Sequence, residues 1–163
     1  MRDSQTDAWR RVGNTGLIVT VDLGEYDKLH PSHRDKVGAR CALAARALAY
    51  GEKDVAYLGP MYHSMRKEGA RIALLFNHIG SGLVAKGGAL DDFTICGSDK
   101  EFVPAQAEIR GDEVVVWSEQ IADPVAVRYG WKNWFTPTLY SREGLPAPTF
   151  RTDSFPLRTQ ESR

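Results

Sequence analysis

An aspartate and a histidine three residues apart are the pair in this sequence best suited to acid–base chemistry. Asp27 and His30 lie between an apolar, β-branched run and a helical pattern. A carboxylate that accepts a hydrogen bond from one imidazole nitrogen leaves the other nitrogen free to take a proton from a nucleophile. Such groups occur on loops at the carboxyl ends of strands in open α/β sheets. The pair therefore predicts a catalytic histidine oriented by an aspartate. An ordinary polar loop is the alternative, because DxxH spacing also arises by chance.

A nucleophile to partner this histidine is not evident in the sequence. The Gly-Ser-Gly run at residues 80–82 lacks the GxSxG pattern of a strand-to-helix nucleophile elbow. The same stretch has neither a dinucleotide-binding nor a Walker glycine pattern, which argues against phosphate binding. If a serine of this chain attacks the substrate, the candidates are Ser32, Ser64 and Ser81.

The remaining histidines favour structural roles. His33 would, with Asp27 and Asp35, suggest a metal site, but it falls in the first turn of a predicted helix and is expected to face solvent. His63 is expected at the surface or edge of a strand, and His78 as a hydrogen-bonded structural residue. We therefore predict no metal site and no cofactor.

The two cysteines do not form a recognisable metal or redox motif. Cys41 lies in an apolar helical pattern and Cys96 in a strand pattern, without CxxC spacing. Both are expected to be small buried hydrophobic side chains, with a disulfide or a reactive thiol as the alternative.

The elements that would position Asp27 and His30 form one strand–loop–helix unit. The run 16–22 predicts a strand buried on both faces, and a polar loop follows over 24–31. Ser32, with an acidic residue three positions later, predicts a capping box for a helix that reaches Tyr50. Gly51 is a suitable stop. Because one strand and one helix cannot form a sheet, we expect this unit to be the last piece of a larger α/β domain.

The rest of the chain is β-rich. Short apolar runs separated by Gly, Pro and Asp predict an antiparallel β-sandwich or jelly roll, ending in a Pro-rich, irregular tail over 144–153. The predicted fold class is thus mixed α/β and β, with residues 1–54 as the α/β remnant and 55–163 as the β-sandwich region. The predicted strands are Met61–Arg66, Arg71–His78, Phe93–Cys96, Gln106–Arg110, Glu113–Ser118 and Val125–Tyr129.

Aromatic side chains gather late in the sequence. Most are expected to lie in the core of the β region, although an exposed subset could stack on sugar rings. They are Trp117, Tyr129, Trp131, Trp134 and Phe135.

The charge balance argues against general electrostatic binding to nucleic acid or to anionic lipid. Of 163 residues, 21 are Lys or Arg and 21 are Asp or Glu, and no third of the chain is polarised. No apolar run is long enough to span a bilayer, and the charged N-terminus does not resemble a signal peptide. We therefore expect neither nucleic acid nor membrane as a partner, and the compartment stays open.

Several ordered motifs resemble the C-terminal part of the sialate O-acetylesterase family, within the SGNH hydrolases. The resemblance covers roughly residues 13–155. It rests on the segments VTVDLGEYDKLHP, VGARCALAARALAYG, GPMYHSM, FNHIGSGL, DPVAVRYGW and GLPAPTFRTD.

The resemblance implies a metal-independent hydrolase that removes acetyl groups from sugars such as sialic acid or from acetylated plant polysaccharide. In this family the DxxHP block supplies the Asp and His of the catalytic triad, which correspond to Asp27 and His30 here. The serine and the Gly and Asn of the oxyanion hole come from blocks further upstream, which this sequence does not contain. By resemblance the chain is a C-terminal fragment of a family whose members are often exported.

Two functions follow from these features. The first is a carboxylic-ester hydrolase, a carbohydrate O-acetylesterase of the serine type, in which this chain supplies the Asp/His part of the triad. Its partners would be an acetylated carbohydrate or another small acyl ester. The second is a non-catalytic β-sandwich module that binds carbohydrate or serves a structural role. In either case the exposed apolar βα unit predicts a homo-oligomer, or association with a missing N-terminal segment.

Overall fold

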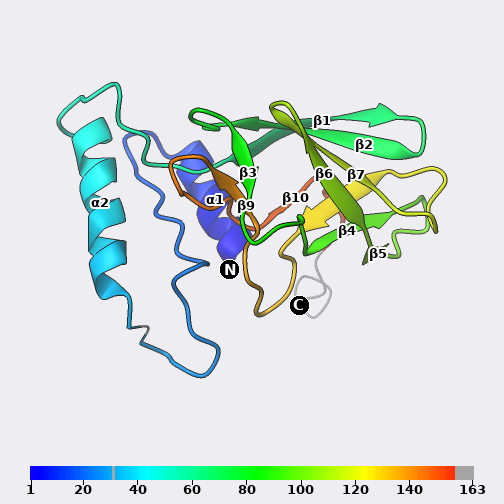
Figure 1. Cartoon of the computed structure of the whole chain (residues 1–163), viewed down its shortest axis with the longest axis horizontal. Helices are drawn as coiled ribbons and strands as arrows, with labels where there is room; N and C mark the ends of the chain where they lie inside the picture. The colour runs from blue at the N-terminus through cyan, green and yellow to red at the C-terminus, as the bar shows by residue number, and fades with distance from the viewer. Residues whose placement is uncertain (31, 157–163) are drawn as a thin grey trace.

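Two helices precede a series of short antiparallel strands. The structure is a computed structural model that describes residues 1–30 and 32–156 (Figure 1). The elements are α1 (Arg2–Arg11), α2 (Arg34–Leu48), β1 (Met61–Glu68), β2 (Arg71–Asn77), β3 (Leu83–Ala85), β4 (Phe93–Cys96), β5 (Val103–Pro104), β6 (Gln106–Arg110), β7 (Glu113–Trp117), β8 (Ala126–Tyr129), β9 (Leu139–Ser141) and β10 (Phe150–Arg151).

The strands form two four-stranded sheets and one two-stranded sheet. Their orders are β1-β2-β7-β6, β10-β8-β4-β5 and β3-β9, and every pair is antiparallel. This confirms the predicted antiparallel β-rich region after a helical segment, although only one of the two helices was predicted. The jelly-roll connectivity and the division of the chain at residue 54 remain predictions.

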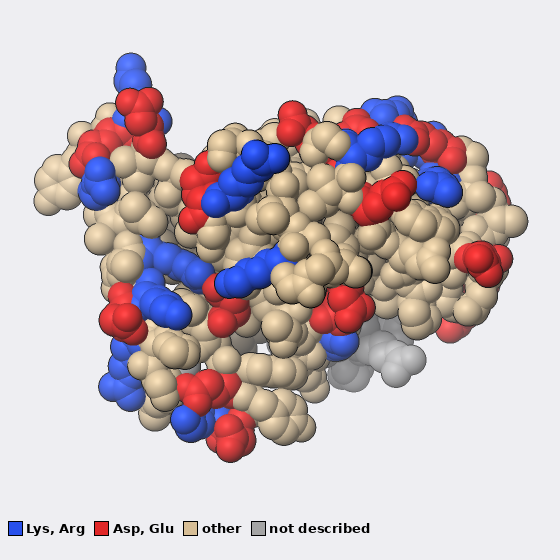
Figure 2. All heavy atoms as spheres, viewed as in Figure 1, with Lys and Arg blue, Asp and Glu red and all other residues tan. Residues whose placement is uncertain are grey.

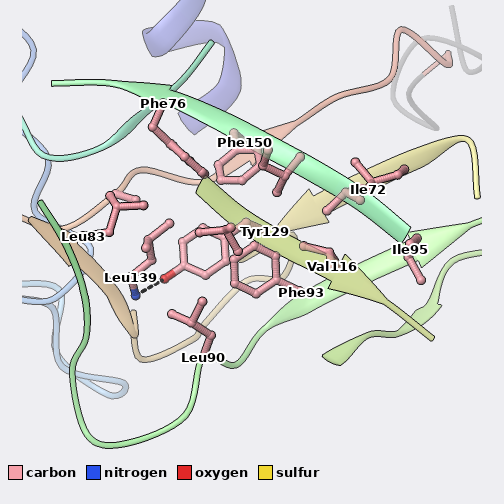
Figure 3. Close-up of a cluster of buried hydrophobic side chains, with 14 of the residues drawn as sticks. Ile72, Phe76, Leu83, Leu90, Phe93, Ile95, Val116, Tyr129, Leu139 and Phe150 are labelled. Atoms are coloured by element: carbon pink, nitrogen blue, oxygen red, sulfur yellow. Dashed lines mark hydrogen bonds between the residues drawn. The ribbon is translucent and has the colours of Figure 1, made fainter. Parts of the chain in front are cut away.

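One apolar core joins the sheets. In the first sheet, Ile72 lies opposite Val116 and Leu74 opposite Val114, and all four side chains are buried. Side chains of β4, β8 and β10 complete the same cluster (Figure 3). The buried Tyr129 hydroxyl accepts hydrogen bonds from the backbone N–H groups of Thr138, at 3.0 Å, and Leu139, at 3.1 Å. Its one polar atom is therefore satisfied inside the core.

The Pro-rich tail is part of this core. Residues 145–150 are all buried, and Phe150 stacks on Tyr62 with ring centroids 5.1 Å apart. Phe150 also begins β10, which pairs with β8. The prediction of an irregular tail was therefore incomplete, because the burial of Phe150 draws the segment against the sheet.

The predicted strand over residues 16–22 does not form. No backbone N–H of residues 17–21 donates a hydrogen bond to any residue that the structure describes. A strand needs a neighbour to complete its ladder of hydrogen bonds, and the described chain supplies none beside this run. In place of the predicted strand–loop–helix unit, the structure has an irregular apolar segment followed by α2.

Helix α2 confirms the predicted helix, with a different N-terminus. The N-cap residue is His33 and makes no side-chain capping hydrogen bond, so the predicted capping box at Ser32 was wrong. Instead, the Ser32 backbone N–H donates to Glu25 Oε1 at 2.7 Å. Helix α1 was not predicted, because its ten residues are almost all polar.

The described part of the chain contains no helix long and apolar enough to cross a membrane. On the face shown in Figure 2, acidic and basic side chains alternate over the surface without a patch of one sign.

Candidate active-site loop

The loop before α2 begins at a buried ion pair. Arg40 of α2 holds both carboxylate oxygens of Asp22, each at 2.6 Å, and also donates to the Val19 carbonyl at 2.6 Å. The two charged side chains are only 12% and 11% exposed. A bidentate pair of this kind is strong and directional, so it fixes the start of the loop against the helix.

The loop closes on itself through Glu25. Its carboxylate accepts the Ser32 backbone N–H and forms an ion pair with Lys28. The hydrogen bond from Lys28, followed by those from Ser32, lowers the pKa of Glu25 to about 2. Glu25 therefore stays ionised across the neutral range and draws the two ends of the intervening loop together.

Asp27 and His30 lie within this closed loop. Both are exposed, and the structure shows no hydrogen bond between them or from either to another described residue. Pro31, the last residue of the DxxHP motif, lies outside the described residues. The fold thus brings the two predicted site residues into one loop without pairing their side chains.

An aromatic contact joins the same loop to the β region. Tyr26 is 82% exposed and meets Trp134 edge to face, with ring centroids 5.9 Å apart. The Trp134 ring also lies over Gly24, where an added Cβ would come within 3.3 Å of it. Leu29, next to His30, is 89% exposed. The loop therefore presents two large hydrophobic side chains to solvent beside the predicted site residues.

None of the three candidate serines is hydrogen-bonded to a histidine in the described chain. Ser32 is exposed and lies in the loop itself, and Ser64 is half-buried on β1. The Ser81 hydroxyl donates to Glu143 Oε1 at 2.7 Å, and its N–H donates to the same oxygen at 2.8 Å. These bonds from Ser81 lower the pKa of Glu143 to about 2. The described residues therefore bring no serine and histidine into a dyad.

The other histidines lie apart from the loop, except His33 at its end. His33 and His63 are exposed, as predicted. His78 has φ of 58° and makes edge contacts with Trp9 and Tyr57. The residue is exposed, but the partial desolvation of its ring by these neighbours lowers its pKa. Its side chain makes ring contacts rather than the predicted hydrogen bond, and within residues 1–30 and 32–156 no group of three His, Cys, Asp or Glu could hold a metal ion.

The two cysteines are both free, and only one is buried. Cys96 lies in the core, where burial raises the pKa of its thiol. Cys41 is exposed, so the prediction of a buried side chain was wrong for this residue. The inward face of α2 follows Val37, Ala44 and Ala47, and Cys41 lies beside that face.

Comparison with known proteins identifies relatives of one kind. No protein-family model matches the chain. The sialate O-acetylesterase of Rattus norvegicus is 30% identical over 156 residues, and that of Homo sapiens is 26% identical over 153 residues. Each match covers 86% of this chain but only 28% and 29% of the relative.

A solved structure agrees with these relatives. A carbohydrate acetylesterase from Xanthomonas citri is 43% identical and superposes with a TM-score of 0.78, over 82% of this chain and 31% of that one. The chain therefore spans less than a third of the length of the proteins it matches. These matches confirm the predicted relationship to sialate O-acetylesterase-like carbohydrate esterases.

Proposed function

Because the chain is related to sialate O-acetylesterases, we propose that it forms part of a carboxylic-ester hydrolase acting on acetylated carbohydrate. Asp27 and His30 are its contribution to a Ser-His-Asp triad. The observation that carries the proposal is the loop itself, which holds this pair between the Arg40–Asp22 ion pair and the Glu25–Ser32 hydrogen bond. Asp and His on a loop fixed at both ends can be presented to a nucleophile in a reproducible position.

The chemistry assigned to His30 is proton transfer in both halves of the reaction. As general base it takes the proton of a serine hydroxyl, whose oxygen attacks the acetyl carbonyl. As general acid it then protonates the sugar oxygen that leaves, and the acetyl group remains on the serine. Water, activated by the same imidazole, releases acetate. Asp27 orients the imidazole and stabilises its protonated form.

The serine comes from one of three sources: another segment of a longer protein, a second chain, or Ser32, Ser64 or Ser81. The absence of a serine–histidine contact within the described residues favours the first two. Exposure of both Asp27 and His30 also supports a site completed by another surface, because each side chain is open to an incoming group.

Hydrolysis of p-nitrophenyl acetate tests the proposal. The chain is assayed alone and co-expressed with the part of the Xanthomonas citri relative that it does not cover. We expect weak or no turnover from the chain alone and restored turnover from the associated pair. His30→Ala should lower that rate by at least about 100-fold, the range for a positioned acid–base group.

His63→Ala is the matched control, since His63 is also exposed but lies on β1. Its rate should equal that of the unchanged chain. Equal rates for the unchanged chain and His30→Ala would reject the site. A folded, associated pair that does not hydrolyse the ester would remove the argument for this function.

The second candidate is a carbohydrate-binding module without catalysis. The exposed contact between Tyr26 and Trp134 favours it, because aromatic rings at a surface are suited to sugar rings. Saccharide binding by a folded, associated pair that never hydrolyses an acetyl ester would select this alternative.

A further inference from the structure

We infer that Tyr26, Trp134 and the cleft beside them bind a neutral pyranose ring of the substrate. This subsite rests on the proposed esterase function and specifies the kind of sugar. The two aromatic residues come from the loop before α2 and from the turn after β8, and their rings meet at 86°. Tyr26 is 82% and Trp134 39% exposed, so both rings are open to a ligand.

A cleft of about 280 Å³ is lined by Trp134, the ring that Tyr26 contacts. Its wall is formed by the apolar run 17–21 and by Gly24, Asn133 and Trp134, with Gln5 of α1 at its edge. The volume lies just below the range of ligand pockets, ~300–1,000 Å³, which suits one sugar ring rather than a long oligosaccharide.

The polar groups of the cleft fit a neutral sugar. Gln5 and Asn133 carry exposed amides, which both donate and accept hydrogen bonds, as sugar hydroxyls require. The apolar face of a pyranose can pack on an aromatic ring while its hydroxyls reach these amides. Aromatic rings and amides together therefore provide both kinds of contact that a pyranose needs.

The cations around the cleft are already engaged, which disfavours an acidic sugar. The one cationic residue that lines the cleft in the described chain is Arg2, which donates to the Lys132 carbonyl and lies over the Phe135 ring at 5.4 Å. Lys132 is paired with Asp92. A carboxylated sugar would have to share Arg2 with these contacts or compete with Asp92 for Lys132, whereas a neutral sugar needs no cation.

The position of the subsite matches the proposed chemistry. Tyr26 directly precedes Asp27, and Gly24 allows the Trp134 ring to lie against the same loop. A sugar held on this pair would therefore be adjacent to the loop that carries His30. The subsite would orient the substrate without taking part in proton transfer.

Binding of saccharides to the full chain tests the subsite without any ester. Titration calorimetry is run with glucose, xylose, mannose and N-acetylneuraminic acid, so that every probe is a single ring. We expect at least one neutral monosaccharide to bind more tightly than N-acetylneuraminic acid. Trp134→Ala and Tyr26→Ala should each weaken that binding at least about fivefold, and Trp134→Phe should retain most of it.

Tyr50→Ala is the matched control, because Tyr50 is 79% exposed but lies beyond the opposite end of α2. Its Kd should be unchanged, and equal thermal melts will show that all variants are folded. The subsite is rejected by an unchanged Kd in Trp134→Ala, by tighter binding of N-acetylneuraminic acid, or by no binding of any neutral saccharide at millimolar concentration. Saccharide binding by the folded, associated pair that persists without hydrolysis would contradict the esterase proposal and leave the subsite standing.

Discussion

At the scale of single residues, the loop before α2 is fixed at its ends and open in its middle. Arg40 holds Asp22 where the loop begins, and Glu25 holds the Ser32 amide where it ends. Asp27 and His30, between them, have no hydrogen-bond partner among the described residues. Their positions are therefore set by the backbone, while their side chains are free to orient toward a completing surface.

Asp27→Asn is expected to reduce hydrolysis by the completed esterase less than His30→Ala does. Asn can still accept a hydrogen bond from the imidazole, but it does not stabilise the imidazolium and favours a wrong tautomer. We expect kcat/KM to fall by more than about tenfold, with KM little changed, because positioned acid–base groups contribute about 100-fold or more. Steady-state kinetics of the two variants, prepared with the same partner segment, provide the comparison. An Asp27→Asn variant as active as the unchanged protein would remove Asp27 from the triad.

The Asp153 carboxylate predicts a loss of stability in acid. Its side chain is fully buried, which raises its pKa, but Arg128 at 2.8 and 3.0 Å and the Phe155 N–H outweigh this effect and lower the pKa overall. A carboxyl with a lower pKa in the folded state stabilises the fold above its unfolded pKa of about 4. That stability is lost as the pH falls from there through the folded pKa.

Asp153→Asn should therefore make the free energy of unfolding depend less steeply on pH in the acid range (the acid limb). At pH 7 the variant should lose about 3–5 kcal/mol, because it leaves the Arg128 charge without a partner. Urea denaturation between pH 2 and 7 measures both effects. Asp112→Asn, at the exposed turn between β6 and β7, is the control and should not alter the acid limb. An acid limb as steep in Asp153→Asn as in the unchanged chain would contradict the assignment.

At the scale of elements, local sequence pattern predicted the strands whose burial is local. β4 and β6 match their predicted ranges, and β1, β2, β7 and β8 differ from theirs only at an end. β3, β5, β9 and β10 were missed because they are only two or three residues long. β3, β9 and β10 also depend on partners that are distant in the chain. The run 16–22 has the composition of a strand but no neighbour. The composition of a segment indicates whether its side chains prefer to be buried. A strand, however, also needs a neighbouring strand to form its ladder of backbone hydrogen bonds.

For the candidate site too, the sequence predicted the local features but not the contacts between distant residues. DxxH spacing and its place before a helix indicated Asp27 and His30 from sequence alone. The contacts of Arg40 with Asp22 and of Tyr26 with Trp134 join elements that no local pattern connects. The sequence therefore predicted the loop but not the groups that hold it.

The Arg40–Asp22 pair should determine how firmly the loop is held on α2. Arg40→Lys keeps the charge but loses the bidentate geometry and the bond to the Val19 carbonyl. We expect a loss of about 1.5–3 kcal/mol from this tether, seen as faster amide hydrogen exchange over residues 19–33. Arg46→Lys, which alters an exposed pair on the same helix, is the control and should leave that exchange unchanged. Equal exchange in Arg40→Lys and the unchanged chain would show that other contacts hold the loop.

Gly130, directly after β8, should not tolerate a side chain. Its φ is 58°, and an added Cβ would lie 2.4 Å from the Phe135 ring. Gly130→Ala should cost about 1–3 kcal/mol for the overpacking alone. Gly111→Ala is the control, because φ is 63° there but no atom lies within 4 Å of the added Cβ. Urea denaturation should find Gly130→Ala the less stable of the two, and equal midpoints would mean that backbone conformation alone decides the cost.

At the scale of the whole molecule, the β region is well packed, whereas helix α2 makes few buried contacts. The core cluster draws on both four-stranded sheets and on the tail, whereas the one buried residue of α2 is Ala44. Figure 1 shows α2 at one side of the molecule, away from the strands. Helix α1, by contrast, is joined to the β region by the Asp3–Arg151 ion pair at 3.2 Å and by Arg10, which donates to the Tyr62 carbonyl at 2.9 Å. Stability should therefore reside mainly in the β region, and the surface most open to a partner is that of residues 16–50.

The apolar run 17–21 predicts that the chain associates in solution. Its residues are β-branched or leucine, and none of its backbone N–H groups has a partner in the described chain. Unpaired amides on an apolar run are a template for pairing with a second strand. We therefore expect light scattering at micromolar concentration to report a dimer or a larger oligomer.

Thr20→Lys places a charge at an exposed position of the run and should shift the population toward monomer. Ser98→Lys, in an exposed turn after β4, adds the same charge elsewhere and should leave the association unchanged. A monomeric chain, or equal association of Thr20→Lys and Ser98→Lys, would show that this run is not the interface.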